Sequence, residues 1–170
     1  MFPSIDGCFL DQAVERPTLS GLEFGPRLGT QAHKMFAAGM EVLLDRGHNP
    51  LKETHIINVG RGGKGVAAEV MSGRCPCILH AKPLMKWITN RGRMLKLNEA
   101  LRLQGMSPEK MKKPRNVSER QFAMQVGNAM SVNVVERILT RLLPAAGLTG
   151  PLEDRWASGA ARRELALTRE

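Results

Sequence analysis

The chain has 170 residues and a mass of 18.7 kDa, and its 25 Lys and Arg against 16 Asp and Glu give a net charge of +9. The length allows about one domain, and the apolar share of 42% excludes wholesale disorder. No apolar run approaches the ~20 residues that cross a bilayer. The N-terminus lacks the pattern of a secretory signal, and three cysteines predict a reducing compartment rather than a disulfide framework.

The positive charge is concentrated in the middle of the chain. Residues 41–120 carry sixteen basic and seven acidic side chains, a net +9, whereas residues 1–40 carry −1, residues 121–150 carry +1 and residues 151–170 are neutral. An isoelectric point near 10.1 favours a polyanionic partner, nucleic acid before an anionic membrane surface. The middle block is therefore either a solvated basic face or a surface that contacts phosphates.

The first third of the chain predicts one helix and one strand. Residues 1–29, rich in Pro and Gly, predict an irregular segment. Residues 30–47 predict a helix that begins at a Thr cap and ends at a Gly, and residues 55–59 predict a strand. The loop at 60–65 holds four glycines and two cations but has no phosphate-binding or dinucleotide spacing. It is either a flexible turn or a basic loop along a nucleic-acid backbone.

Beyond residue 76 the sequence predicts two short strands and then helices. Residues 77–80 and 87–89 predict two short strands, and residues 97–105 have helical spacing. Ser107-Pro108-Glu109 predicts another helix start, and Ser118 with Gln121 predicts a capping box. Beyond residue 131 an apolar stripe predicts an amphipathic helix that ends near Pro144, and residues 150–170 predict a frayed helix.

The cysteines and histidines do not predict a site. Cys75-Pro76-Cys77 with His80 offers too few ligands for a structural zinc. Cys77 lies in an apolar, strand-like run, which favours a buried thiol over a nucleophile. The four histidines lack acidic partners at a recognisable spacing and are expected to be ordinary surface or core residues. No catalytic residue and no metal ligand is therefore nominated.

Two segments resemble known motifs. Residues 93–106 read RMLKLNEALRLQGM and residues 125–129 read QVGNA. In order and spacing they resemble the ninth and tenth motifs of the cytosine-5 DNA methyltransferase family, Arg-x-Leu-Thr-x-Arg-Glu-x-x-Arg-Leu-Gln-Gly-Phe and Gln-Val/Ile-Gly-Asn-Ala/Ser-Val. Lys96 replaces the usual Thr, and Met106 replaces the aromatic residue. The matching positions are Arg93, Leu95, Glu99, Arg102, Leu103, Gln104, Gly105, Gln125, Gly127, Asn128 and Ala129.

The resemblance covers residues 93–139, and residues 55–92 look like the end of that family's target recognition domain. It implies chemistry in which a cysteine attacks C6 of a flipped cytosine and C5 accepts a methyl group from S-adenosylmethionine. The family's Pro-Cys-Gln, Glu-Asn-Val, Phe-x-Gly-x-Gly and Gln-x-Arg-x-Arg motifs do not occur here, and Ile78 follows Pro76-Cys77. The chain is therefore expected to be a C-terminal fragment that does not methylate DNA alone.

The resemblance assigns roles to particular residues. Asn128 and Met130 would help to close the S-adenosylmethionine pocket. Ile78 and Leu79 stand where the family often has a Thr on the DNA backbone. Structural roles fall to Glu99, Arg102, Gln104, Gly105, Gln125 and Gly127. The basic block offers as DNA-backbone contacts Arg61, Lys64, Lys82, Lys86, Arg91 and Arg93.

The expected fold is a mixed, helix-rich α/β fragment. It would be the C-terminal part of an S-adenosylmethionine-dependent methyltransferase fold, doubly wound in the parent, with part of the DNA recognition lobe. Expected partners are DNA and a catalytic region that carries the absent motifs, and no association with a membrane is expected. The protein is expected in the nucleus if the source is eukaryotic and in the cytoplasm otherwise. A non-catalytic DNA- or RNA-binding module and an unrelated basic scaffold protein stay open. The predicted segments are an irregular N-terminus at 1–29, a partial target recognition domain at 30–92, the methyltransferase motifs at 93–147 and a tail at 148–170.

Overall fold

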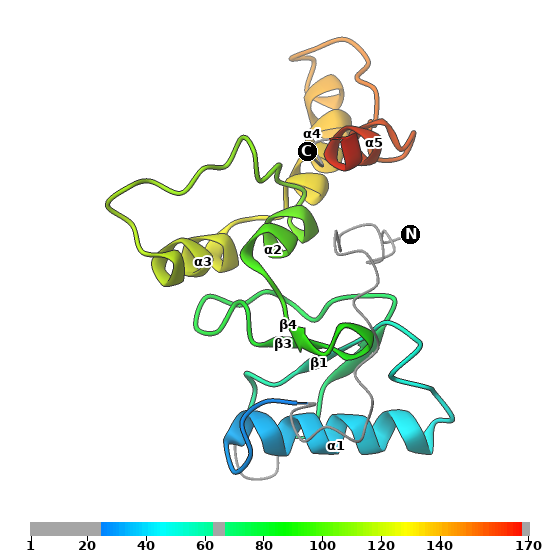
Figure 1. Ribbon diagram of the computed structural model, residues 1–170. Helices are drawn as coiled ribbons and strands as arrows, with labels where there is room; N and C mark the ends of the chain where they lie inside the picture. The colour runs from blue at the N-terminus through cyan, green and yellow to red at the C-terminus, as the bar shows by residue number, and fades with distance from the viewer. Residues whose placement is uncertain (1–24, 63–66, 168–170) are drawn as a thin grey trace.

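The computed structural model describes residues 25–62 and 67–167, which form a mixed α/β fold (Figure 1). The mixed class is as predicted, and the sheet is small and antiparallel, with strand order β2-β1-β3-β4. Most of the predicted segment 1–29, with Lys64 and the last three residues, lies outside the described residues. The strands are β1 (His55–Asn58), β2 (Val70–Ser72), β3 (Lys86–Ile88) and β4 (Arg93–Met94).

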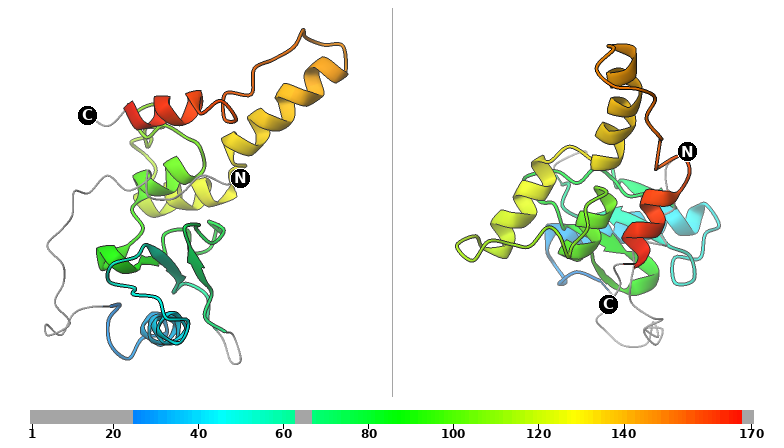
Figure 2. Two further views of the ribbon diagram at one scale, coloured as in Figure 1. Left: turned by 90° about the vertical axis from the view of Figure 1, so that its right-hand side faces the viewer. Right: turned by 90° about the horizontal axis from the view of Figure 1, so that it is seen from above.

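Helices cover both faces of this sheet. Helix α1 (Gln31–Asp45) lies on one face, and α2 (Leu97–Leu103) with α3 (Glu119–Asn128) lies on the other (Figure 1). Helix α4 (Val132–Ala145) projects away from this body, and α5 (Ala160–Leu167) follows it (Figure 2). Within the described residues, no helix combines the length and the apolar character that a membrane span requires.

The two apolar clusters follow from the alternation of side chains along the strands. Ile57 and Trp87 pack with Phe36 and the rest of one cluster on the α1 side of the sheet. Their neighbours Ile56 and Ile88 point the other way and pack in a second cluster with α2 and α3. The central strand β1 is therefore buried on both faces.

Local capping determines where several helices begin, as predicted. The Thr30 side chain accepts a hydrogen bond from the His33 backbone at 3.2 Å and caps α1. Ser118 and Gln121 form the predicted capping box of α3. Helix α4 is also confirmed and ends just beyond Pro144, but none of its residues is buried.

Three predicted elements are wrong. Residues 77–80 form no strand. The strand that pairs with β1 on the side away from β3 is β2, which has no strong apolar pattern of its own. No helix begins at Ser107, because residues 109–116 are exposed and offer no apolar face to pack. The C-terminal helix begins ten residues later than predicted, at Ala160.

Candidate functional site

The first motif segment is held by an ion pair. The Arg93 guanidinium donates to both carboxylate oxygens of Glu99, from Nη1 at 3.0 Å and from Nη2 at 2.8 Å. Glu99 also accepts the backbone N–H of Lys96 at 2.8 Å, at the start of α2. Such two-point pairing is strong and directional, and the side chains of Arg93 and Glu99 are only 22% and 4% exposed. Arg93 therefore stabilises the start of α2 through Glu99 and does not offer its guanidinium to a phosphate. The prediction that Arg93 contacts the DNA backbone is therefore wrong.

Arg102 lies on the same helix and is also buried. Its side chain is 5% exposed, and Nη2 lies 3.5 Å from Oε1 of Glu109. A guanidinium in that position braces the loop that follows α2. The geometry agrees with the structural role expected of Arg102.

Gln104 connects the two motif segments. Its side-chain Nε2 donates to the backbone carbonyl of Val126 at 3.2 Å, and its Oε1 accepts from the Ser131 hydroxyl. Its backbone carbonyl accepts the N–H of Val132 at 2.9 Å. One buried residue at the end of α2 thus contacts the end of α3 and the start of α4.

Glycines permit close approach around this junction. Gly105 has a φ of +76°, and a Cβ there would lie 3.0 Å from the backbone nitrogen of Asn133. Gly127, by contrast, lies inside α3 and has no positive φ. A Cβ on Gly127 would lie 2.8 Å from backbone atoms of Leu79 and His80. Gly127 is therefore required for close packing of α3 on the 79–80 segment, and the turn falls after Asn128.

The two predicted cofactor residues lie at the end of α3: Asn128 is its last residue, and Met130 follows two residues later. Asn128 is exposed, and Met130 is 75% exposed at the mouth of a groove of ≈ 680 Å³. The groove runs along α4 under the 152–155 segment and has mainly apolar side chains, among them Val135 and Leu139. Of the two residues, Met130 lines this open apolar groove.

No family model, no curated protein and no solved structure matches this chain. The motif residues and the geometry that joins them are therefore the features of this chain that bear on its function.

Lys86 corrects the predicted set of DNA contacts. It is 1% exposed in the central sheet, and its Nζ donates to Oδ1 of Asn58 at 3.0 Å. Burial lowers the pKa of this amine. A side chain that is buried in the sheet and hydrogen-bonded to Asn58 does not reach a phosphate. The prediction that Lys86 contacts the DNA backbone is therefore wrong.

The other nominated cations divide by exposure. Arg61 is exposed, with its Nη1 3.8 Å from Glu69, and Arg91 is half-buried. Lys82 is exposed and lines a cavity of ≈ 470 Å³ between the 81–85 segment and α3. Arg120 lines the same cavity and was missed by the sequence argument. The predicted capping box at Ser118 could have indicated this residue, because it places Arg120 in the first turn of α3.

Two predictions about cysteine and histidine are also wrong. Cys77 is exposed on a segment without regular structure, rather than buried in a strand. His48 and His55 both contact an acidic partner, Glu53. The three residues follow no regular spacing in the sequence, because a turn and a strand bring them together.

Proposed function

We propose that this chain is the C-terminal part of a cytosine-5 DNA methyltransferase, which forms one wall of the methyl-donor pocket and part of the DNA-binding lobe. The observation that supports this best is the set of contacts made by Gln104. Two segments that resemble separate motifs of one family are bonded directly to each other through a buried amide. In an unrelated basic protein, two chance matches would have no reason to meet in this way.

Asn128 and Met130 would form one side of the cofactor site. The Asn128 amide offers both a donor and an acceptor, and Met130 offers an apolar contact beside the groove along α4. When bound, S-adenosylmethionine would supply the methyl group. Asn128 and Met130 would orient it and exclude water from one side. One wall binds weakly, so we expect no measurable cofactor affinity from the chain alone.

The other requirements of methyl transfer would come from a catalytic region. The 170 residues contain no Pro-Cys-Gln nucleophile and no Glu-Asn-Val segment, so covalent attack on cytosine needs a partner that carries them, in cis or in trans. Lys82 and Arg120 would contact the DNA backbone as exposed cations. The proposed compartment is the nucleus in a eukaryote and the cytoplasm otherwise.

A non-catalytic DNA- or RNA-binding module is the alternative function. The exposed cations and the missing nucleophile favour it, because both would be expected of a protein that binds nucleic acid without modifying it. It leaves the contacts between the two motif segments without a functional explanation.

Sequencing upstream of Met1, followed by a methyl-transfer assay, tests the proposal. Any catalytic region found there is expressed with the chain, and transfer from tritiated S-adenosylmethionine to duplex DNA is measured. We expect turnover with that region and none from the 170 residues alone. Asn128→Ala should reduce turnover, whereas Asn116→Ala, at another exposed asparagine, should not.

Two results would contradict the assignment. One is an upstream sequence without the Phe-x-Gly-x-Gly, Pro-Cys-Gln and Glu-Asn-Val motifs, which would favour the binding-module alternative. The other is equal turnover for Asn128→Ala and Asn116→Ala. Turnover from the 170 residues alone would contradict the inference that the nucleophile comes from elsewhere.

A further inference from the structure

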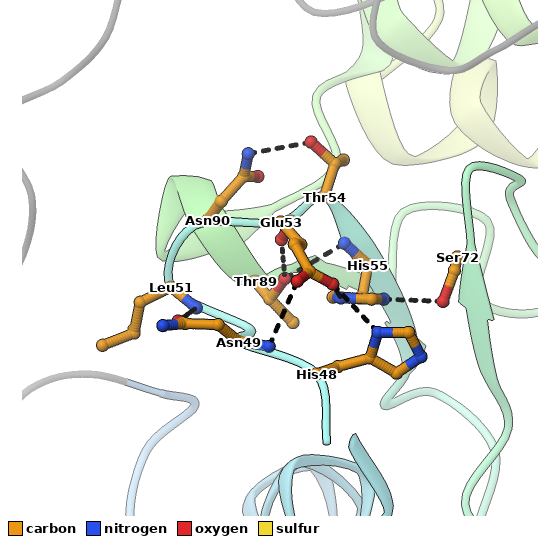
Figure 3. A network of polar contacts seen from close by, with 9 residues as sticks. All are labelled: His48, Asn49, Leu51, Glu53, Thr54, His55, Ser72, Thr89 and Asn90. Atoms are coloured by element: carbon orange, nitrogen blue, oxygen red, sulfur yellow. Dashed lines mark hydrogen bonds and ion pairs between the residues drawn. The ribbon is translucent and has the colours of Figure 1, made fainter. Parts of the chain in front are cut away.

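Two imidazoles and one carboxylate converge where the α1–β1 loop meets the sheet (Figure 3). His48 Nδ1 lies 2.9 Å and His55 Nε2 lies 3.1 Å from the same oxygen, Oε2 of Glu53. The three donor atoms all lie within 4.8 Å of one another. This group is remote in sequence from the residues that resemble methyltransferase motifs.

His48 is positioned by the end of α1. Gly47 has a φ of +74°, and its N–H donates to the carbonyl of Leu44 at 2.9 Å. The N–H of His48 donates to the carbonyl of Leu43 at 3.0 Å. These two bonds form a Schellman motif, which fixes the direction in which the chain leaves the helix.

Glu53 is positioned by a turn around Asn49. The Asn49 side chain accepts the N–H of Leu51 at 3.1 Å, and its carbonyl accepts the N–H of Glu53 at 2.9 Å. The carbonyl of Glu53 in turn accepts the Thr89 hydroxyl at 3.1 Å. The loop is therefore tied to itself and to the sheet (Figure 3).

His55 is positioned by the sheet. It pairs with Ser72 across β1 and β2, and its Nδ1 lies 2.7 Å from the Ser72 hydroxyl. Its backbone N–H donates to the Thr89 hydroxyl at 3.1 Å. A second ring nitrogen that is held by a hydrogen bond is the usual arrangement of a metal-binding histidine.

We infer that His48, Glu53 and His55 form a binding site for one divalent transition-metal ion, of which zinc is the best match. Two imidazole nitrogens and one carboxylate oxygen are a known zinc ligand set. Ligands about 2.0–2.1 Å from zinc at the corners of a tetrahedron lie about 3.3 Å apart. Two of the three separations, at 2.9 and 3.1 Å, are close to that value. The two imidazole nitrogens lie within 4.8 Å of each other, so side-chain rotations would bring all three atoms around one ion.

The three side chains differ in exposure. The His55 side chain is 2% exposed, whereas those of His48 and Glu53 are 39% and 48% exposed. An ion from solution would therefore reach the group from the side of His48 and Glu53.

The other explanation is a hydrogen-bond network in which both imidazoles donate to Glu53. Titration calorimetry with ZnCl₂ on the full chain under reducing conditions separates the two. We expect saturable one-to-one binding. His48→Ala and Glu53→Gln should weaken it by about 100-fold or more, since the loss of an outer hydrogen-bond partner alone typically costs 10–100-fold. His33→Ala, a histidine on α1 outside the group, is the matched control and should bind like the wild type.

Cobalt(II) absorption identifies the ligands. Imidazole and carboxylate ligands should give only d–d bands, without the charge-transfer band of a thiolate, and Cys75→Ser/Cys77→Ser should leave the affinity unchanged. Both His48 and Glu53 are partly exposed, so these variants should keep the wild-type circular dichroism spectrum. The inference is overturned if the wild type shows no saturable binding, if His48→Ala binds as tightly as the wild type, or if the serine variant abolishes binding.

Discussion

Replacing Gln104 by Ala tests whether the junction between the two motif segments holds the fold together. The substitution removes two side-chain hydrogen bonds, to Val126 and from Ser131. At about 1 kcal/mol each, these account for about 2 kcal/mol. The substitution also removes one buried methylene, Cγ, which adds about 0.8 kcal/mol. We therefore expect Gln104→Ala to lower the free energy of unfolding by about 3 kcal/mol.

Urea unfolding followed by far-ultraviolet circular dichroism measures this loss. Gln125→Ala is the matched control, because Gln125 belongs to the same motif pair but is exposed. Its effect should stay within about 0.5 kcal/mol. Ser131→Ala should cost about 1 kcal/mol, and the double variant should lose less than the sum of the single losses because the two residues share a bond.

Equal destabilisation by Gln104→Ala and Gln125→Ala would contradict a stabilising role for Gln104. Simple addition of the losses at Gln104 and Ser131 would contradict the bond between them. In either case the contact seen between the segments would contribute nothing measurable to the folded state.

Three further outcomes follow from the structure. Gly127→Ala should lower the free energy of unfolding by about 1–3 kcal/mol through overpacking, despite the better helix propensity of Ala; Gly150→Ala, where nothing lies within 4 Å, should change it little in the same urea assay. Burial lowers the pKa of Lys86, so the unfolded chain holds this proton to higher pH than the folded chain does. Wild-type stability should therefore rise with pH up to about 10.4 relative to Lys86→Met, and equal pH profiles would contradict this. In DNA titrations by fluorescence anisotropy, Lys82→Ala and Arg120→Ala should each reduce the slope of log affinity against log salt by about 0.9, whereas Lys86→Met should leave it unchanged.

Local features of the sequence predict much of the helical structure. Thr30 and the Ser118–Gln121 pair mark helix starts because their side chains bond to backbone groups three residues away. The stripe along α4 also predicts that helix correctly. None of these predictions needs knowledge of a distant partner.

The errors concern residues whose state depends on distant partners. Lys86 has the appearance of a surface cation in the sequence. Its burial depends on the pairing of β3 with β1, which places Asn58, 28 residues away, where it accepts a hydrogen bond from the amine. Strand β2 is defined by its pairing with β1 rather than by its own three residues. His48, Glu53 and His55 meet because a helix end, a turn and a strand follow one another in a short stretch, which no simple spacing rule describes.

The burial of β1 on both faces has a consequence for how the sheet finds its alignment. A shift by one residue would exchange Ile56 and Ile57 between two equally apolar layers, so hydrophobicity alone discriminates poorly against it. The directly opposed pairs His55–Ser72 and Asn58–Lys86 do discriminate, because each would lose its side-chain bond. These opposed polar pairs thus select one register among near-equivalent ones. Their loss would broaden the folded ensemble as well as lower its stability.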